Sequence, residues 1–443
     1  MVEQMVEKET EVKQMRAAIY TLGCKVNIYE SEYVTSELVK NGYTIVDWEE
    51  AADVYIINTC SVTNEADKKD RKIINGALKR NKDAIIIVMG CHVQAGFPIE
   101  GANIVIGNKD KSKIVELIEE YKENNQNITR VYDLTSADFE DMQITNFNKH
   151  TRAFVKIQDG CNAFCTYCII PYIRGSLRSK EESKVIAEVT SLTEKGFKEI
   201  VLTGIHTGRY GIDKETNLYH LLTQLVKIPN LYRIRLSSIE INEITEEIIE
   251  LIKTNPIMAK HLHIPLQSGS DHILKMMNRK YDVDYYINKI NEIRREIPDI
   301  SITTDLILGF PDETEENYQE TLNTLNKIKF TKIHTFPYSR RKGTSADKMP
   351  NQIDGKIKKE RVREVLELSN KYEQEYYTNN LNKEYEILTE DHKDKTIGYT
   401  TNYIPVVLPT HKPNNQVIKV TLTKLDKDTN QIFGEIKEEV VTK

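Results

Sequence analysis

The sequence predicts an α/β protein with three folded parts, and three patterns lead to this prediction. In the N-terminal third, short runs rich in Ile and Val alternate with helical stretches, as in a parallel sheet buried on both faces. Six further alternations of strand and helix follow, which favour a partial, TIM-like (β/α)6 barrel because the closed form has eight units. The last part changes to short alternating segments between polar turns, the pattern of a small antiparallel β-barrel.

The composition is that of a globular protein. Of the 443 residues, 39% are apolar and 29% are charged, with 12 Pro and 19 Gly, which excludes disordered and collagen-like classes. The formal charge of -6 gives no overall basic field, so any nucleic-acid site has to be local. The charged leader at 1–15 lacks the apolar region of a secretory signal, and no apolar run approaches the ~18 residues of a membrane span. We therefore expect a cytoplasmic protein without a membrane anchor.

In the first part, 16–145, a cysteine directly follows each of three predicted strands. The strands span 17–23, 54–59 and 84–90, and the cysteines are Cys24, Cys60 and Cys91. Because the carboxyl ends of parallel strands lie along one edge of a sheet, we expect these three thiols at one site. The alternative is that they are ordinary buried cysteines, which are common in α/β cores.

The second part, 146–378, contains the predicted barrel and a linking helix. The barrel strands span 154–160, 199–204, 233–238, 261–267, 301–310 and 332–339. Helical signals are clearest at 182–195, which Gly196 ends, and residues 354–380 form the linking helix. The third part, 379–443, has strand-like segments at 384–390, 403–409, 417–425 and 431–437. Chemistry is expected at the carboxyl ends of the barrel strands.

A second group of cysteines follows the first barrel strand. Cys161, Cys165 and Cys168 stand as C-x3-C-x2-C, so three thiolates from one loop can converge on a metal centre. A four-iron cluster with three thiolates keeps one iron open for a ligand, whereas a structural zinc site needs four ligands. A zinc knuckle with a distant fourth ligand is the alternative here, and His92 beside Cys91 is the corresponding zinc candidate in the first part.

Four motifs then carry a resemblance to a known family. TLGCKVNIYES at 21–31, INTCSVTNEADKKDRK at 57–72, VMGC at 88–91 and GCNAFCTYCIIPYIRG at 160–175 resemble those of the radical SAM methylthiotransferases. The resemblance covers essentially the whole chain and implies an N-terminal cluster domain, a radical SAM barrel and a C-terminal TRAM-like domain. TLGCKVN with CSVTNEAD is similar to the branch that modifies N6-threonylcarbamoyladenosine at position 37 of tRNA. The branches acting on isopentenyladenosine or on a ribosomal-protein aspartate differ after the first Gly-Cys.

The resemblance also implies cofactors and their ligands. Cys161, Cys165 and Cys168 would hold a 4Fe–4S cluster that binds S-adenosylmethionine (SAM), and Cys24, Cys60 and Cys91 would hold a second 4Fe–4S cluster. One SAM would methylate the sulfur that is transferred, and another would supply the radical that activates the adenine carbon C2. The partners implied are the tRNA anticodon stem-loop, not DNA, and an electron donor such as flavodoxin or ferredoxin.

Further candidate residues lie at strand ends and in one basic segment. We expect SAM contacts from Tyr167, Thr203, Gly204, Ser237 and Gln267, although ordinary strand-end turns would explain the same sequences. In GFPDET at 309–314, Asp312 stands where the family usually has Gly, and Asp can start a helix, so we interpret it as structural.

The basic segment is 339–363, which has nine Lys or Arg against three Asp or Glu. It makes Arg340, Arg341 and Lys342 candidate tRNA contacts, unless it is only a solvated helix face. The leading hypothesis is a tRNA methylthiotransferase acting on threonylcarbamoyladenosine. The alternatives are a methylthiotransferase for isopentenyladenosine or a ribosomal-protein aspartate, and a non-catalytic, zinc-stabilised RNA-binding protein.

Overall fold

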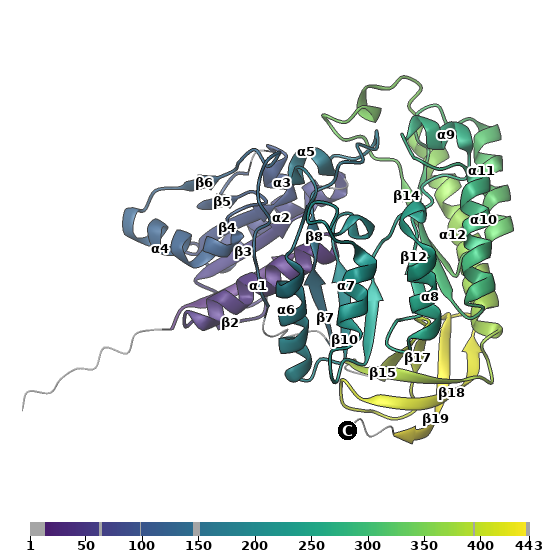
Figure 1. Ribbon diagram of the computed structural model, residues 1–443. Helices are drawn as coiled ribbons and strands as arrows, with labels where there is room; N and C mark the ends of the chain where they lie inside the picture. The colour runs from purple at the N-terminus through teal and green to yellow at the C-terminus, as the bar shows by residue number, and fades with distance from the viewer. Residues whose placement is uncertain (1–13, 62–63, 98, 145–150, 393–394, 440–443) are drawn as a thin grey trace, which may run out of the picture. The chain divides into compact units, whose positions relative to one another are not determined.

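The computed structural model describes residues 14–61, 64–97, 99–144, 151–392 and 395–439 (Figure 1). The chain divides into two compact units, one ending at Tyr132 and the other starting at Asp133. Within the described ranges, no helix is both long enough and apolar enough to cross a bilayer.

The first unit is a six-stranded parallel sheet in the order β2-β1-β3-β4-β5-β6. Its strands are β1 (Arg16–Thr21), β2 (Thr44–Ile45), β3 (Val54–Thr59), β4 (Ile85–Gly90), β5 (Ile104–Ile106) and β6 (Ile128–Arg130). The helices are α1 (Lys25–Lys40), α2 (Asn64–Arg80), α3 (Cys91–Gln94) and α4 (Ile114–Asn124), with a short 3-10 turn at Lys111–Lys113. The predicted strands at 17–23, 54–59 and 84–90 are confirmed, whereas β2, β5 and β6 were not predicted.

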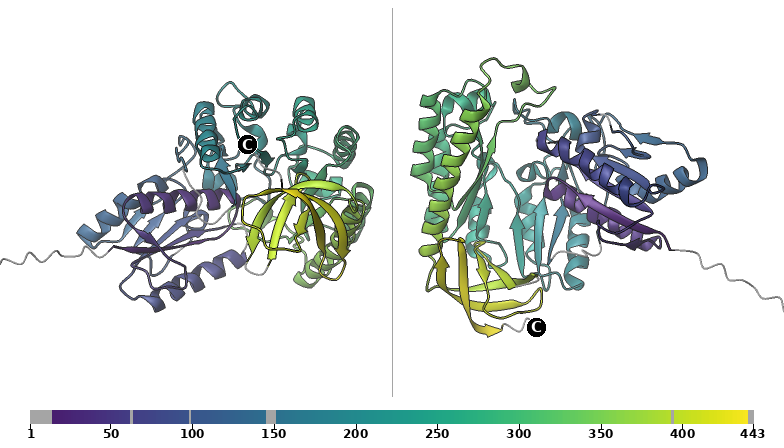
Figure 2. Two further views of the ribbon diagram at one scale, coloured as in Figure 1. Left: turned by 90° about the horizontal axis from the view of Figure 1, so that it is seen from below. Right: turned by 180° about the vertical axis from the view of Figure 1, so that it is seen from behind.

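Both faces of this sheet are covered, as the Ile- and Val-rich strands require. One apolar cluster joins Ile56 and Ile87 to α1 and α4, and the other joins Tyr55 and Val88 to α2. The left view of Figure 2 shows helices on both faces. All six residues of β3 and of β4 are buried, which is why these strands show no alternation in sequence.

The second unit contains the six predicted barrel strands. They are β7 (Arg152–Lys156), β10 (Glu199–Thr203), β11 (Arg233–Leu236), β12 (His261–His263), β13 (Ser301–Leu308) and β14 (Lys332–Pro337). Strands β7, β10 and β11 are parallel neighbours, as are β12, β13 and β14. Two isolated bridges, Ile234 with Met258 and Ser238 with His263, connect the two halves. The structure therefore confirms the predicted six-stranded, open series.

Helices alternate with these strands. They are α6 (Glu182–Glu194), α7 (Leu218–Leu225), α8 (Glu246–Thr254), α9 (Asp271–Met276), α10 (Val283–Glu296) and α11 (Glu315–Ile328). A small hairpin of β8 (Gln158–Asp159) and β9 (Arg178–Ser179) encloses the short helix α5 (Ile170–Arg174), and three 3-10 turns lie at Thr207–Arg209, Ile241–Glu243 and Ala346–Lys348. The predicted linking helix is α12 (Gly355–Thr378), which lies along β14: the Ile333 N–H donates to Ser369 Oγ at 2.9 Å.

The C-terminal strands form a closed barrel in the order β15-β16-β17-β19-β18. They are β15 (Glu384–His392), β16 (Lys395–Thr400), β17 (Pro405–Val407), β18 (Val417–Asp426) and β19 (Gln431–Glu439). Two corrections apply to the prediction: β16 was not predicted, and β17 pairs with β19 in parallel, so the barrel is not wholly antiparallel. Its apolar core includes Tyr377 of α12, so the linking helix is part of the barrel's packing.

Buried charges join this barrel to the amino ends of the parallel strands. Glu199 Oε2 accepts from Arg233 Nη1 at 3.1 Å, and Glu199 Oε1 accepts from Arg235 Nε at 2.9 Å. The same Arg233 nitrogen donates to the backbone oxygen of Tyr399 at 2.9 Å, and the Arg235 guanidinium lies 4.1 Å from the Tyr403 ring centre. One carboxylate therefore balances guanidiniums that reach across to the C-terminal barrel.

We predict that Glu199→Gln lowers the free energy of unfolding by about 3 to 5 kcal/mol, because it leaves buried guanidiniums without their counter-charge. Denaturant unfolding measures the effect. The control is Glu296→Gln, which breaks a solvent-exposed ion pair with Lys253 and should change the stability far less, because water and salt screen such a pair. Equal effects of the two variants would contradict the assignment.

The same carboxylate predicts an acid-labile contribution to stability. Burial alone would raise the pKa of Glu199, but Arg235, Arg233 and Arg152 outweigh it and lower the pKa from 4.5 to about 2. Because the folded pKa is the lower one, the stabilisation is complete above about pH 4.5 and is lost as the pH falls towards 2. The stability curve of Glu199→Gln should lack this loss.

Candidate functional site

The first three cysteines lie together at one edge of the N-terminal sheet. Cys24 precedes α1, Cys60 follows β3, and Cys91 begins α3 directly after β4. Strands β1, β3 and β4 are adjacent and parallel, so their carboxyl ends meet. A Cβ atom on Gly23, where φ is +102°, would lie 3.0 Å from Cys60 Sγ, which shows how closely the turn before Cys24 passes that thiol.

Asparagine side chains fix the turns that carry these thiols. Asn27 Nδ2 donates to the backbone oxygens of Leu22 (2.7 Å) and Thr59 (2.9 Å), and so ties the Cys24 turn to the end of β3. At Gly90, where φ is +103°, a Cβ atom would come within 2.6 Å of Asn58 Oδ1. Asn27 lies in the GCKVN motif, but its anchoring role was not predicted from sequence.

The surroundings of Cys91 include a residue that sequence reasoning missed. Asn108 Nδ2 lies 3.7 Å from Cys91 Sγ, and its Oδ1 accepts from Lys111 Nζ at 3.3 Å. Lys111 also forms a fully buried ion pair with Glu30 of α1. His92 is buried and stacks on Phe97 at 4.7 Å between ring centres.

The second cysteine group forms a tight loop between β8 and α5. The Cys161 N–H donates to Gly175 O at 3.1 Å, and the Cys168 N–H donates to Cys165 O at 2.9 Å. A Cβ atom on Gly160, where φ is +71°, would lie 2.0 Å from Ser176 O, so this close return of the chain requires glycine.

These three thiols have the chemistry of a soft-metal donor set. Burial raises the pKa of the Cys168 thiol to about 12, and the neighbouring Cys165 and Cys161 add to the rise. A buried thiol of this kind becomes a thiolate when a metal centre supplies positive charge, and three cysteines in one loop fit an iron–sulfur cluster. Among the described residues, no three Cys, His, Asp or Glu side chains converge closely enough for one metal ion. A four-iron cluster places its thiolates on separate irons and accepts a wider set.

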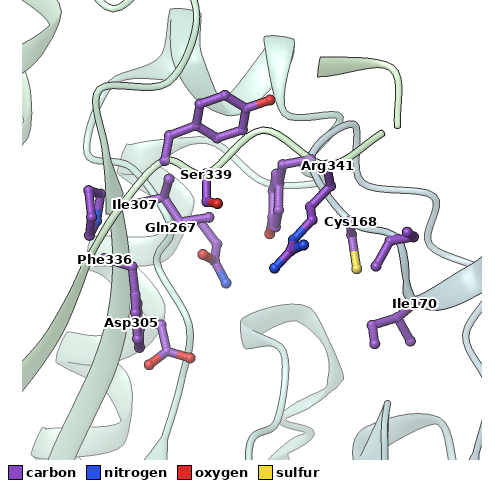
Figure 3. A pocket seen from close by; sticks show the side chains of 12 residues that line it. Cys168, Ile170, Gln267, Asp305, Ile307, Phe336, Ser339 and Arg341 are labelled. Carbon is purple, nitrogen blue, oxygen red and sulfur yellow. The ribbon is translucent and has the colours of Figure 1, made fainter. Parts of the chain in front are cut away.

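A cavity of about 240 Å³ opens beside Cys168 (Figure 3). Tyr167 and Gln267, both predicted SAM contacts, line it. Its other walls come from the Cys168 loop, from β13 and from the end of β14: Ile169, Ile170, Asp305, Ile307, Phe336, Pro337, Tyr338, Ser339 and Arg341. Figure 3 shows Gln267, Asp305 and Arg341 directed into the same space. Sequence reasoning missed Asp305, which lies within the predicted strand 301–310, and Ser339, which ends the predicted strand 332–339.

The other predicted SAM contacts, Thr203, Gly204 and Ser237, are not among the lining residues of this cavity. A Cβ atom on Gly204 would come within 3.0 Å of Gln158 Oε1, which also accepts from the His206 N–H at 2.6 Å. Ser237 Oγ lies 3.1 Å from Thr207 Oγ1. The structure therefore places two of the five predicted contacts in the cavity wall, and it places Gly204 beside Gln158, which bonds the backbone of His206.

Positive side chains that the sequence did not reveal contact this loop. His206 Nδ1 lies 3.4 Å from Cys161 Sγ, and its Nε2 lies 2.7 Å from Glu243. Burial alone would lower the pKa of His206, but Cys161 and Glu243 raise it to about 10. Arg279 Nη1 donates to Cys165 Sγ at 3.3 Å. The loop thiols therefore have cationic neighbours on two sides.

A buried carboxylate precedes the loop. Asp159 forms ion pairs with Arg174 (3.1 Å), Arg178 (3.3 Å) and Lys156 (3.4 Å). Burial opposes ionisation, but these three cations hold the pKa of Asp159 well below its usual range. The charged cluster anchors the β8–β9 hairpin on which the cysteine loop is mounted.

The candidate tRNA contacts have different environments. Arg340 is exposed and pairs with Asp347 at 3.0 Å, and Lys342 is exposed. Arg341 is only 3% exposed and lines the cavity beside Cys168.

Asp312 does not start the helix that follows it. Thr314 is the N-cap of α11 and forms a capping box with Asn317. Asp312 instead has φ of +70° and accepts from Asn351 Nδ2 at 2.9 Å. The positive φ gives a physical reason for glycine at this position in similar sequences.

Comparisons with known proteins agree with this geometry. Residues 155–325 match the radical SAM superfamily, and residues 16–98 match a family described as "Uncharacterized protein family UPF0004". A solved structure of the radical S-adenosylmethionine methyltransferase TsrM from Kitasatospora setae shares the fold, with a TM-score of 0.56, 13% identity and coverage of 72% of each chain.

Curated relatives extend the similarity to nearly the full length. The threonylcarbamoyladenosine tRNA methylthiotransferase MtaB of Bacillus subtilis is 42% identical over 96% of this chain and 98% of its own length. The enzyme of the same name from Aquifex aeolicus is 39% identical over 92% of this chain and its entire length. The tRNA-2-methylthio-N(6)-dimethylallyladenosine synthase of Thermoanaerobacter pseudethanolicus is 37% identical over 87% of this chain and 84% of its own. The chain therefore belongs to the radical SAM methylthiotransferase family, whose members use SAM and 4Fe–4S clusters.

Proposed function

We propose that this protein adds a methylthio group to C2 of N6-threonylcarbamoyladenosine at position 37 of tRNA, with two SAM molecules and two 4Fe–4S clusters. The observation that carries the proposal is the 42% identity to an enzyme of that name over 96% of the chain. The motifs TLGCKVN and CSVTNEAD support the same branch.

In this proposal each cysteine group holds one cluster. Cys161, Cys165 and Cys168 hold the cluster that binds SAM, and Cys24, Cys60 and Cys91 hold the other. When bound, the clusters supply the electron that cleaves SAM and the sulfur that is transferred. The protein's own residues position these groups: Gly23 and Gly90 leave the space that the strand-end turns need, and Asn27 fixes their spacing.

The cavity beside Cys168 is the proposed place for SAM. Its apolar walls exclude water from the reacting centre, and Gln267, Asp305 and Arg341 offer hydrogen bonds to the polar ends of the cofactor. Thr203, Gly204 and Ser237 are proposed to approach the cofactor from the Cys161 side.

We propose four parts along the chain: a leader at 1–15, a cluster domain at 16–145, a radical SAM domain with linking helix at 146–378, and a TRAM-like domain at 379–443. The tRNA anticodon stem-loop is the proposed partner, with Arg340 and Lys342 as its exposed candidate contacts. The proposed location is the cytoplasm, where a flavodoxin or ferredoxin supplies electrons.

Separate cysteine variants should divide the chemistry. After anaerobic reconstitution, the wild type should hold about eight iron atoms per chain, and Cys161→Ala and Cys24→Ala should each hold about four. Cys161→Ala should abolish SAM cleavage, whereas Cys24→Ala should keep cleavage without methylthiolation. Iron and sulfide analysis and product chromatography measure these outcomes. Equal loss of cleavage in both variants would contradict the division, and stoichiometric zinc without labile sulfide would favour a non-catalytic RNA-binding protein.

The substrate is tested by nucleoside mass spectrometry of tRNA from a deletion strain. We expect the 2-methylthio form of threonylcarbamoyladenosine to disappear and its precursor to accumulate. Complementation with the wild-type gene should restore the product, and the Cys24→Ala gene should not. Loss of the methylthio group from dimethylallyladenosine instead would assign the activity of the 37%-identical relatives, and unchanged tRNA would overturn both assignments and leave the ribosomal-protein aspartate.

A further inference from the structure

Arg279 is a buried cation that contacts the cysteine loop. It lies two residues beyond Met277, near the end of α9, and its side chain is only 5% exposed. Nη1 donates to Cys165 Sγ at 3.3 Å, Nη2 forms a close ion pair with Glu240, and Nε donates to Tyr281 Oη at 3.1 Å. All three guanidinium nitrogens therefore have directed partners, and one of these partners is a proposed cluster ligand.

The guanidinium and the loop belong to one local framework. The Thr166 N–H and Oγ1 donate to the backbone oxygens of Met277 (3.1 Å) and Met276 (2.8 Å), and Asn278 Nδ2 donates to Phe164 O at 3.2 Å. These bonds connect the end of α9 to the residues on either side of Cys165. The distance between Arg279 and the sulfur is thus set by backbone contacts as well as by the side chain.

Tyr281 and Glu240 hold the guanidinium from its other edges. The Tyr281 hydroxyl donates to Pro265 O and Leu266 O, both at 3.0 Å, so its oxygen is fixed at the end of β12. The Arg279 guanidinium lies 5.0 Å from the Tyr281 ring centre. Glu240 follows β11, so the cation is held between two neighbouring strand ends.

We propose that Arg279 is a positioning residue that raises the reduction potential of the cluster held by Cys161, Cys165 and Cys168, and that Glu240 both orients Arg279 and offsets part of its effect. The inference rests on the proposed function. The cluster gains one negative charge when it takes one electron from its donor, and an N–H directed at a ligand sulfur favours that added charge. A nearby carboxylate opposes it, and low exposure strengthens both effects.

A purely structural ion pair would need only the contact with Glu240. Here the planar Arg279 guanidinium also directs a second nitrogen at the Cys165 sulfur. A lysine ammonium cannot reach that sulfur while it keeps its contacts with both Glu240 and Tyr281. The two residues should therefore act on the potential in opposite directions, whereas a general loosening of the loop would lower cluster content.

The test uses the full chain with Cys24, Cys60 and Cys91 replaced by Ala, so that only one cluster contributes to the EPR signal. Dithionite is the one-electron reductant, and EPR-monitored titration gives the midpoint potential. Arg279→Lys should lower the midpoint potential of the cluster. At the solution potential that half-reduces the cluster of the background chain, its ratio of reduced to oxidised cluster should be about tenfold lower, which corresponds to about 59 mV for one electron. Glu240→Gln keeps the shape but removes the charge, and should shift the potential in the positive direction.

The control is Glu390→Gln, which removes a carboxylate paired with Arg152 at 2.8 Å on the C-terminal barrel and should leave the potential unchanged. Iron content near four per chain in every variant shows that the loop still folds around its cluster. Unchanged potentials, or shifts of the same sign in Arg279→Lys and Glu240→Gln, would overturn the inference. If the chain in which Ala replaces Cys24, Cys60 and Cys91 holds no iron, the proposed function of the Cys161–Cys168 loop is overturned instead.

Discussion

Parallel strands end together, and the first group of thiols and the cavity beside the second group both depend on this constraint. In the N-terminal sheet it brings Cys24, Cys60 and Cys91 to one edge although 36 and 31 residues separate them along the chain. In the barrel it gathers the Cys161–Cys168 loop and the ends of β13 and β14 around one cavity. Because the parallel strand ends already bring these residues together, the connecting loops need to contribute only short turns and local hydrogen bonds.

Those anchors are polar and buried, which has an energetic consequence. Asn27 and Asn58 have their amide groups bonded to backbone beside the first thiols, and Asp159 balances three cations before the second group. Removing one member of such a set leaves its partners desolvated and unpaired, so each position is more sensitive than a solvent-exposed turn. The sites are consequently held by hydrogen bonds that a cofactor does not have to provide.

The sequence was most informative where the signal was local. Runs such as Ile85–Gly90 are apolar throughout, and the spacing of Cys161, Cys165 and Cys168 is visible directly. It was least informative for short or polar strands, because β5 has three residues and β16 is largely polar. Distant pairing was also hidden, because the parallel contact between β17 and β19 depends on barrel closure. Arg279 and Cys165 are 114 residues apart, so only the fold brings that cation to that sulfur.

The amino and carboxyl ends of the barrel strands make different contacts. Glu199 begins β10 and pairs with Arg233, which contacts the C-terminal barrel, whereas Thr203 ends the same strand beside Gly204, and both of these are proposed SAM contacts. Four residue steps of about 3.3 Å separate these ends by about 13 Å. The contacts that hold the C-terminal barrel are therefore set apart from the end of the same strand at which Gly204 lies.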